Sequence, residues 1–257
     1  MDAPHMRPVF ILISSLLLLF AIKAQAELFS DIEFITENYP PYNYEKNNLA
    51  AGISVEILLQ AAQAAGQPIL REHIHVRPWA RGYRQALIGP KVMLFSMART
   101  PDRERNFQWV GPIMKIRIAA MAKKENAIRI KLANDFSPYA IGTVRDDAGE
   151  QLLKKLDINN TFKAFQVSST PQALIKKIDL GRIKIMVLDD IVAHKLIKAE
   201  GLNPEDFEVV YVFKETESYF AFSKDVSKKL LQSLQNGLNK LKQRNDGKDY
   251  ESLIHSH

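Results

Sequence analysis

The sequence contains no cysteine. Without thiols the chain cannot form disulfide bonds, bind a metal through thiolates, use a cysteine nucleophile or carry a lipid on an N-terminal cysteine. It also lacks the G-x-S-x-G, H-E-x-x-H and Walker patterns of common hydrolases, zinc proteases and nucleotide-binding enzymes. These absences remove the catalytic centres that are easiest to recognise, although the lack of an obvious nucleophile does not exclude catalysis.

The sequence has only one long apolar run, from Val9 to Ile22. A membrane-spanning helix needs about 20 such residues, so this run is too short for a permanent anchor. Arg7 precedes the run, and a small-x-small ending follows it at Ala24 and Ala26. Residues 1–26 are therefore predicted to be a secretory signal peptide, cleaved after Ala26, and the mature protein is expected to be exported.

Dense blocks of Lys and Arg interleaved with aromatics are missing. Removing 26 of the 257 residues leaves 231, and because the removed segment holds Arg7, Lys23 and Asp2, the formal net charge falls from +6 to +5. This small surplus is spread along the chain, so we expect no nucleic-acid partner. A chain of this length forms one large domain or two lobes of about 100 residues each.

Strand-like and helix-like segments alternate along the mature chain. The first series has predicted strands at 31–36, 69–76, 91–97 and 117–124, with helices at 54–66 and 79–89. The second has strands at 139–144, 161–167, 183–189 and 207–213, with helices at 147–156, 170–181 and 190–201. A strand at 218–225 and a helix at 227–247 remain. This order predicts an α/β protein with two lobes, each a mainly parallel sheet flanked by helices.

Several segments follow one another in a characteristic order after the predicted signal peptide. They are "NYPPYNY", "AGISVEILLQAAQAAG", "PWARGYRQAL", "ARTPDRERNFQWVGP", "IGTVRDDAGEQLL", "LGRIKIMVLDD" and "LNKLKQRNDGKDYESL". Their order and spacing resemble the family 3 extracellular solute-binding proteins, the periplasmic receptors that deliver amino acids and related polar solutes to ABC importers. The resemblance covers essentially the whole mature chain.

This resemblance implies the two-lobed type II periplasmic-binding-protein fold with a two-strand hinge. The first lobe would comprise residues 27–121, the second lobe 122–215, and residues 216–257 would return to the first; the hinge would lie near 121–124 and 213–217. A monomer in the periplasm would close around a small polar or zwitterionic solute and present it to a membrane permease. It would need no cofactor or metal and would not be an enzyme.

Three arginines, Arg99, Arg103 and Arg105, lie between a buried strand and an aromatic-Gly-Pro turn. Ligands bind outside the carboxyl ends of strands in open parallel sheets, and this segment follows such an end. In the family, the Arg of a Thr-x-x-Arg turn binds the ligand carboxylate, which the resemblance carries to Arg103. A planar guanidinium suits that role. The alternative is a surface ion pair with a neighbouring carboxylate, Asp102 or Glu104; Arg99 and Arg105 are expected to be solvated or structural.

A second anchor is expected from the other lobe, because closure requires contacts that form only when both lobes meet the ligand. The resemblance assigns the ligand's ammonium group to Asp189, at the end of a buried strand. A buried carboxylate is costly unless it is paired. The alternative is that Asp189, or its neighbour Asp190, only caps the following helix.

Further contacts are expected around these two anchors. By resemblance, Tyr39, Tyr42 and Trp79 would pack around the apolar part of the ligand, although such rings also serve as core residues. Ser96 and Glu37 are predicted as additional polar contacts.

The sequence departs from the family pattern at two places. Phe95 and Ala98 stand where amino-acid receptors carry hydroxyl residues, and "RDDAG" replaces a Gly-Ser/Thr turn that offers donors to the carboxylate. Asp146 and Asp147 would repel an anion there, and Arg145 could compensate. A cationic or modified solute therefore stays open beside a standard amino acid.

Some residues also suggest other functions. His73 and His75 would share one strand face and could bind a metal, but nothing nearby completes such a site, so exposed histidines are expected. His255 and His257 at the end of the chain are expected to do nothing specific. A lyase or dehydratase on this fold would use Arg103 for substrate and Asp189 or Glu37 as general acid. A sensory module signalling to a membrane partner is a further alternative, because fold does not decide function.

Overall fold

The computed structural model describes residues 29, 31–157, 162 and 164–244. The predicted signal peptide and its cleavage site, as well as His255 and His257, lie outside these residues. Contacts divide the chain into two units, Met1–Asp31 and Ile32–His257, and the elements below belong to the second. In the described part of the chain, no helix has the length and apolar character needed to cross a membrane.

One eight-stranded sheet connects the elements of this unit, in the order β4-β1-β5-β10-β6-β9-β7-β8. Its strands are β1 (Glu33–Thr36), β4 (Ile74–Val76), β5 (Val92–Ala98), β6 (Gln108–Lys123), β7 (Ala140–Val144), β8 (Ala164–Ser168), β9 (Ile185–Asp189) and β10 (Phe207–Phe222). Strands β4, β1 and β5 are parallel and form the sheet of the first lobe. Strands β9, β7 and β8 are parallel and form that of the second.

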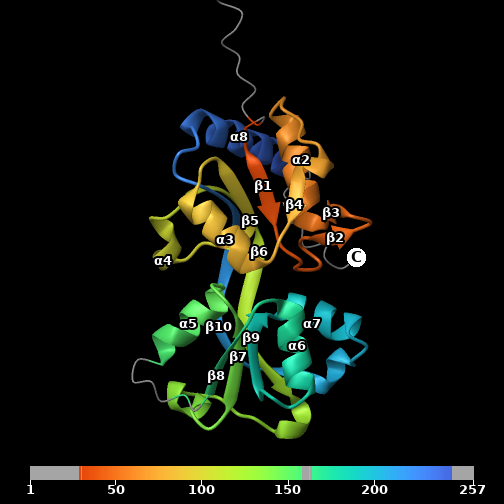
Figure 1. Cartoon of the computed structure of the whole chain (residues 1–257), viewed down its shortest axis with the longest axis vertical. Helices are drawn as coiled ribbons and strands as arrows, with labels where there is room; N and C mark the ends of the chain where they lie inside the picture. Colours follow the sequence, from red (N-terminus) through yellow and green to blue (C-terminus); the bar gives the residue numbers. More distant parts are fainter. Residues whose placement is uncertain (1–28, 30, 158–161, 163, 245–257) are drawn as a thin grey trace, which may run out of the picture. The chain divides into compact units, whose positions relative to one another are not determined.

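Strands β6 and β10 run through both lobes as an antiparallel pair (Figure 1). Pairing of β10 with β5 begins at Ser218, and pairing of β6 with β9 begins at Ile118. Between these points, residues 115–117 of β6 lie opposite residues 215–217 of β10 with no third strand beside them. The sheet is thus only two strands wide at this place.

Helices cover the sheet in both lobes. The first lobe has α2 (Ile53–Ala64), α3 (Trp79–Ile88), the short α4 (Pro101–Glu104) and α8 (Lys228–Arg244). The second has α5 (Ala148–Leu156), α6 (Pro171–Asp179) and α7 (Asp190–Ala199). Short elements are the hairpin β2 (Tyr44–Lys46) and β3 (Leu49–Ala51), and the 3₁₀ turns η2 (Arg71–His73), η3 (Lys124–Asn126), η4 (Ala133–Phe136) and η5 (Pro204–Asp206). Helix α8 packs on α2, as Figure 1 shows.

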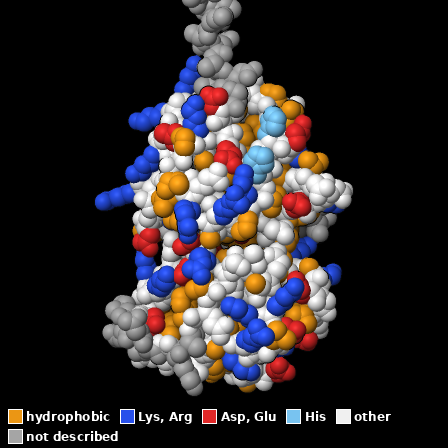
Figure 2. All heavy atoms as spheres, in the orientation of Figure 1, with side chains coloured by type: hydrophobic (Ala, Val, Ile, Leu, Met, Phe, Trp, Pro, Cys, Tyr) orange, Lys and Arg blue, Asp and Glu red, His pale blue; other side chains and the backbone are white. Residues whose placement is uncertain are grey.

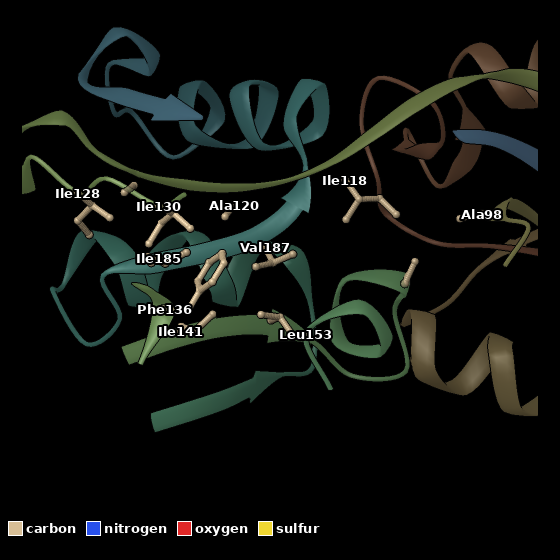
Figure 3. Packing of buried hydrophobic residues seen from close by; sticks show 12 residues of the cluster. Ala98, Ile118, Ala120, Ile128, Ile130, Phe136, Ile141, Leu153, Ile185 and Val187 are labelled. Atoms are coloured by element: carbon tan, nitrogen blue, oxygen red, sulfur yellow. The ribbon is translucent and has the colours of Figure 1, made fainter. Parts of the chain in front are cut away.

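Alternation of apolar residues explains the core of the second lobe. Ile118, Ala120 and Ala122 of β6 share one face of the sheet because successive side chains of a strand point to opposite faces. Strands β7 and β9 place buried residues on the same face, and the fully buried Phe136 of η4 packs over them (Figure 3). Ala148 and Leu153 of α5 belong to the same cluster, so α5 packs on this face of the sheet.

The structure differs from the prediction in three local features. Residues 207–213 and 218–225 were expected as separate strands, but a single strand, β10, runs from Phe207 to Phe222. The aromatic-Gly-Pro segment was expected to turn, but it lies inside β6; Gly111 is needed there because a Cβ would approach the Tyr219 ring to 2.5 Å. His73 lies in η2 and only His75 in β4, so the two do not share one strand.

Candidate functional site

Segments that follow the carboxyl ends of the parallel strands make contacts between the two lobes. Gln172 Nε2, after β8, donates to the carbonyl of Asn38, after β1, at 3.3 Å. Lys155 of α5 forms an ion pair with Asp102 of α4 at 2.8 Å. Because strand ends are where open sheets collect ligands, this contact region is the candidate site.

Arg103 lies at the centre of this region and is fully buried, with 0% of its surface exposed. Its Nη1 donates to the Ala98 carbonyl at 3.2 Å, and its Nη2 donates to the Asp146 carbonyl of the second lobe at 2.8 Å. Within the described residues no carboxylate forms an ion pair with it, and its Nε has no hydrogen-bond partner. The guanidinium therefore keeps one donor, its Nε–H, without an acceptor among the described residues.

The surface ion pair considered as an alternative for Arg103 does not form. Glu104 binds Arg99 through two bonds of 2.7 and 2.6 Å, and Asp102 binds Lys155. Arg99 also lies over the rings of Trp109 and Tyr219, so it has a structural role. Of the two nearest acids in the sequence, neither pairs with Arg103.

Two aromatic rings flank the Arg103 guanidinium. Its central carbon lies 5.4 Å from the centroid of Trp79 and 5.2 Å from that of Tyr83, within the range of cation–π attraction. Trp79 is the first residue of α3, is 3% exposed, and has a buried Nε1 without a hydrogen-bond partner. Among the described residues, the indole Nε1–H and the guanidinium Nε–H thus both lack an acceptor.

Asp189 ends β9 and caps α7, as its capping alternative predicted. Its Oδ1 accepts from Val192 N at 3.0 Å and from the Tyr42 hydroxyl of the first lobe at 3.3 Å, while Oδ2 accepts from Arg117 N at 3.2 Å. Burial raises the pKa of Asp189 from 3.8 to about 7. The neighbouring Asp190 forms an ion pair with Arg117. The Asp189 carboxyl therefore already has three donors.

Tyr39 and Tyr42, in the segment after β1, both reach β9 of the second lobe. The Tyr39 hydroxyl accepts from Asp189 N at 3.3 Å, and the two rings lie 6.1 Å apart. Tyr42 is 1% exposed, so its ring is a core residue as well as a contact between the lobes. Burial raises the pKa of Tyr39 well above its ordinary value. Tyr39 is therefore a neutral hydrogen-bonding group.

Two further carboxyl groups approach Arg103. Glu37 follows β1 and is 7% exposed, and Asp147 caps α5 by accepting from Ala148 N at 2.7 Å. Burial raises the pKa of both carboxyl groups. The charge of Asp147 adds to this shift for Glu37, and the charge of Arg103 opposes the shift for each of them. Asp147 was expected at a helix start, and it caps α5; the repulsion of an anion predicted for it stays a prediction.

Ser96 occupies an irregular position in β5. It has a positive φ of 65°, and it lies where the ladder between β5 and β10 shifts register. Such a bulge turns a side chain out of the regular alternation. The Ser96 hydroxyl donates to the Ser54 hydroxyl of α2 at 2.7 Å, so it is engaged within the first lobe.

Two adjoining pockets lie at the junction of the lobes. One, of about 200 Å³, is lined by Glu37, Arg77, Trp79, Thr170 and Gln172, among others. The other, of about 480 Å³, has Arg81 and Arg84 of α3 on one side and Arg145 on the other. Pro78 lines both. Figure 2 shows Lys and Arg side chains gathered over α3.

Arg145 is exposed, and its pocket is not the one lined by Glu37 and Trp79. The predicted residues therefore fall into groups. Trp79 and Glu37 line the smaller pocket and lie near the buried guanidinium of Arg103. Tyr39, Tyr42 and Asp189 form one contact between the lobes, and Ser96 binds Ser54.

The sequence reasoning missed several polar groups at strand ends. Thr36 ends β1, Ser168 ends β8 and Thr143 lies near the end of β7. Each hydroxyl is buried and has no hydrogen-bond partner among the residues that the structure describes. Thr170 and Gln172, after β8, line the smaller pocket. Their position directly after a predicted strand was the available signal. Across the residues placed in the structure, no group of three or more His, Asp or Glu could hold a metal ion.

Known proteins resemble this chain in sequence pattern and in fold. The model of the bacterial extracellular solute-binding proteins, family 3, matches residues 32–250. Comparison with curated protein sequences finds no match.

Solved structures share the fold at low sequence identity. A histidine kinase sensor domain with similarity to periplasmic binding proteins has a TM-score of 0.74 and 16% identity, covering 89% of this chain and 96% of its own. An ancestral arginine-binding protein bound to arginine has a TM-score of 0.71 and 19% identity, and the match covers 87% of this chain and 98% of that protein. The arginine-, lysine-, histidine-binding protein ArtJ from the thermophilic bacterium Geobacillus stearothermophilus has a TM-score of 0.68 and 17% identity, and the match covers 88% of this chain and 94% of that protein.

These neighbours are two-lobed binding proteins or a sensor domain of that fold. The family match spans most of the sequence, and the two-lobed α/β architecture agrees with it. The chain belongs to the bacterial extracellular solute-binding proteins of family 3.

Proposed function

We propose that this protein captures a small polar or zwitterionic solute, an amino acid or a related compound, between its two lobes and presents it to the membrane permease of an ABC importer. The observation that carries the proposal is Arg103: a fully buried guanidinium with an unused Nε–H and no ion-pair partner in the described chain. A buried charge that forms no ion pair is costly. An anionic group of the solute would form that ion pair.

The neighbours of Arg103 support this proposal. Trp79 adds an unpartnered N–H and, with Tyr83, a flat apolar surface beside the guanidinium. The unpartnered hydroxyls of Thr36, Thr143 and Ser168 lie at strand ends in both lobes.

The sheet supports closure about a hinge. We place the hinge where β6 and β10 form a ribbon of two strands, residues 115–117 and 215–217, because few backbone bonds oppose bending there. The second stretch overlaps the predicted 213–217, while the first lies ahead of the predicted 121–124. We still propose one lobe of residues 27–121 and 216–257 and a second lobe of residues 122–215, apart from this shift of the hinge.

A thermal-shift screen of the mature chain against amino acids, polyamines and small organic acids tests the proposal. A solute that binds only the folded state raises the melting temperature. We expect a hit among nitrogen-containing carboxylates, with affinity then measured by isothermal titration calorimetry.

Arg103→Met should abolish binding of that hit, whereas Arg105→Met, two residues away and exposed, should leave it unchanged. Full affinity in Arg103→Met would refute the anion-binding role. Consumption of the solute during the titration would instead favour the lyase alternative.

A sensory module is the second candidate function. The similarity to a histidine kinase sensor domain favours it, since that protein uses the same fold for signalling. The two functions share the solute site and differ in the partner of the closed form. Co-purification of the solute-bound chain with a permease, as opposed to a membrane kinase, would separate them.

A further inference from the structure

Three arginine side chains line the pocket of about 480 Å³ at the junction of the lobes. Arg81 and Arg84 belong to α3 of the first lobe, and Arg145 follows β7 of the second lobe. Among the described residues that line this pocket, none is an aspartate or a glutamate. The pocket therefore has positive charge on both sides and no acid in its lining to balance it.

These three arginines have no acidic partner within the protein. In the described part of the chain, none of the three side chains forms an ion pair or a hydrogen bond. Arginines elsewhere do form ion pairs with acids, namely Arg71, Arg77, Arg99, Arg117 and Arg129. The chain thus pairs arginines at many places and leaves three together in one pocket unpaired.

The acids closest to these arginines along the chain or across the sheet do not neutralise them. Glu33 of β1 contacts α3, but it accepts hydrogen bonds from Gln85 and from Arg77. Asp146 follows Arg145 directly, yet among the described residues the two form no ion pair. The charge of the pocket is therefore left to anions from solution.

Backbone structure fixes the arginines on the two sides of the pocket. Arg81 and Arg84 are three residues apart in α3 and so lie on the same side of that helix. The Arg145 backbone N–H donates to the Ser168 carbonyl at 2.9 Å, which holds Arg145 beside Ser169, a further residue of the lining. Guanidinium groups from two lobes thus line one space, over the region of α3 where Figure 2 shows Lys and Arg gathered.

The size and charge of the pocket indicate its ligand. Small-molecule sites typically have volumes of about 300–1,000 Å³, so this pocket suits a small molecule better than an element of a partner protein. A cleft lined by one sign of charge concentrates ions of the opposite sign. A planar guanidinium binds carboxylate or phosphate oxygens through two parallel N–H donors.

We propose that this pocket binds a small anion with two or more negative charges, a polycarboxylate or a phosphate compound, through Arg81 and Arg84 of the first lobe and Arg145 of the second. The shared chemistry is a cluster of anionic oxygens. Arg103, which carries the proposed function, does not line this pocket, so the inference goes beyond that function and does not depend on it. Because both lobes supply charge, the bound anion bridges them.

Calorimetry of the mature chain at constant ionic strength tests this site, with acetate, citrate and pyrophosphate as probes. We expect citrate or pyrophosphate to bind at a single site at least about tenfold more tightly than acetate, because each additional anionic oxygen pair can engage another guanidinium. Tighter binding of citrate assigns the site to polycarboxylates, and tighter binding of pyrophosphate assigns it to phosphate compounds. A preference over acetate below about twofold would overturn the inference.

Substitutions locate the anion. Arg81→Gln, Arg84→Gln and Arg145→Gln each remove one charge from the pocket and should each weaken binding of the preferred anion about fivefold or more. Arg105→Gln removes an exposed charge outside the pocket and is the matched control, with unchanged affinity. Should Arg84→Gln fail to fold, Arg84→Lys, which keeps the charge but loses the two parallel donors, replaces it and should still weaken binding.

Two further measurements separate this pocket from other sites. Arg103→Met should keep the affinity for the preferred anion, and its loss would place the anion at the solute site and overturn the inference. A hexaglutamate peptide that binds more tightly than both anions would overturn it in favour of an acidic protein partner. Equal affinities of the wild type and the three glutamine variants would also overturn it. A solute screen without any hit would refute the proposed function and leave this inference standing.

Discussion

The protonation of Asp189 should make the stability of the protein fall as pH rises. Burial raises the pKa of this carboxyl from 3.8 to about 7. Between these values the folded state holds a proton that the unfolded chain has released, so the folded state is favoured at the acidic end and loses that advantage as pH rises through the folded pKa.

The size of the effect follows from the two pKa values. Each pH unit between them is worth about 1.4 kcal/mol, so ionisation of Asp189 lowers the free energy of unfolding by up to about 4 kcal/mol between pH 4 and pH 7. Three donors, Val192 N, Arg117 N and the Tyr42 hydroxyl, oppose the shift, and the charge of Asp190 adds to it. Glu37 and Asp147 have pKa values raised in the same direction and steepen the dependence.

Urea unfolding followed by circular dichroism at pH 4, 5.5, 7 and 8.5 measures this dependence. Asp189→Asn cannot ionise and keeps an oxygen that can cap α7, so its free energy of unfolding should decline less steeply with pH than that of the wild type. Asp206→Asn, at an exposed position, is the matched control and should follow the wild type. Equal slopes for the wild type and Asp189→Asn would refute the reasoning.

Three substitutions probe the packing of the fold through chemical denaturation. Phe136→Ala removes the ring at the centre of the second-lobe core and should cost about 3–5 kcal/mol; a loss below about 1 kcal/mol would contradict its place there. Gly237→Ala puts a Cβ 2.0 Å from the Ala61 carbonyl oxygen and should lower stability by about 1–3 kcal/mol despite the better helix propensity of Ala, so an unchanged midpoint would contradict the close α2–α8 contact. Thr170→Ala removes the cap of α6 and should cost about 1 kcal/mol, whereas Thr170→Ser should not.

Local sequence patterns predicted most elements because the relevant interactions are local. The apolar run at β5 and the Thr170–Pro171 start of α6 indicated a buried strand and a helix start, and both are confirmed. The continuity of β10 could not be predicted in this way. Its middle, residues 214–217, is polar and lies where the sheet is two strands wide, so its pairing with β6 depends on residues about 100 positions away.

The site was predictable where one residue's position decides its role. Arg103 lies in α4, the short helix after β5, and its burial agrees with the expectation that it is more than a surface charge. The surroundings of Glu37 could not be predicted, because they depend on what the second lobe places opposite it. The same holds for Asp189, whose three donors come from β6, α7 and the segment after β1.

The central claim is that Arg103 is kept buried and unpaired in order to bind an anionic group of a solute. A crystal structure of the mature chain with the best-binding carboxylate from the screen tests it most directly. We predict the carboxylate within hydrogen-bonding distance of Arg103 Nε, next to Trp79 Nε1. A solute bound elsewhere, with Arg103 still donating only to the Ala98 and Asp146 carbonyls, would contradict the claim.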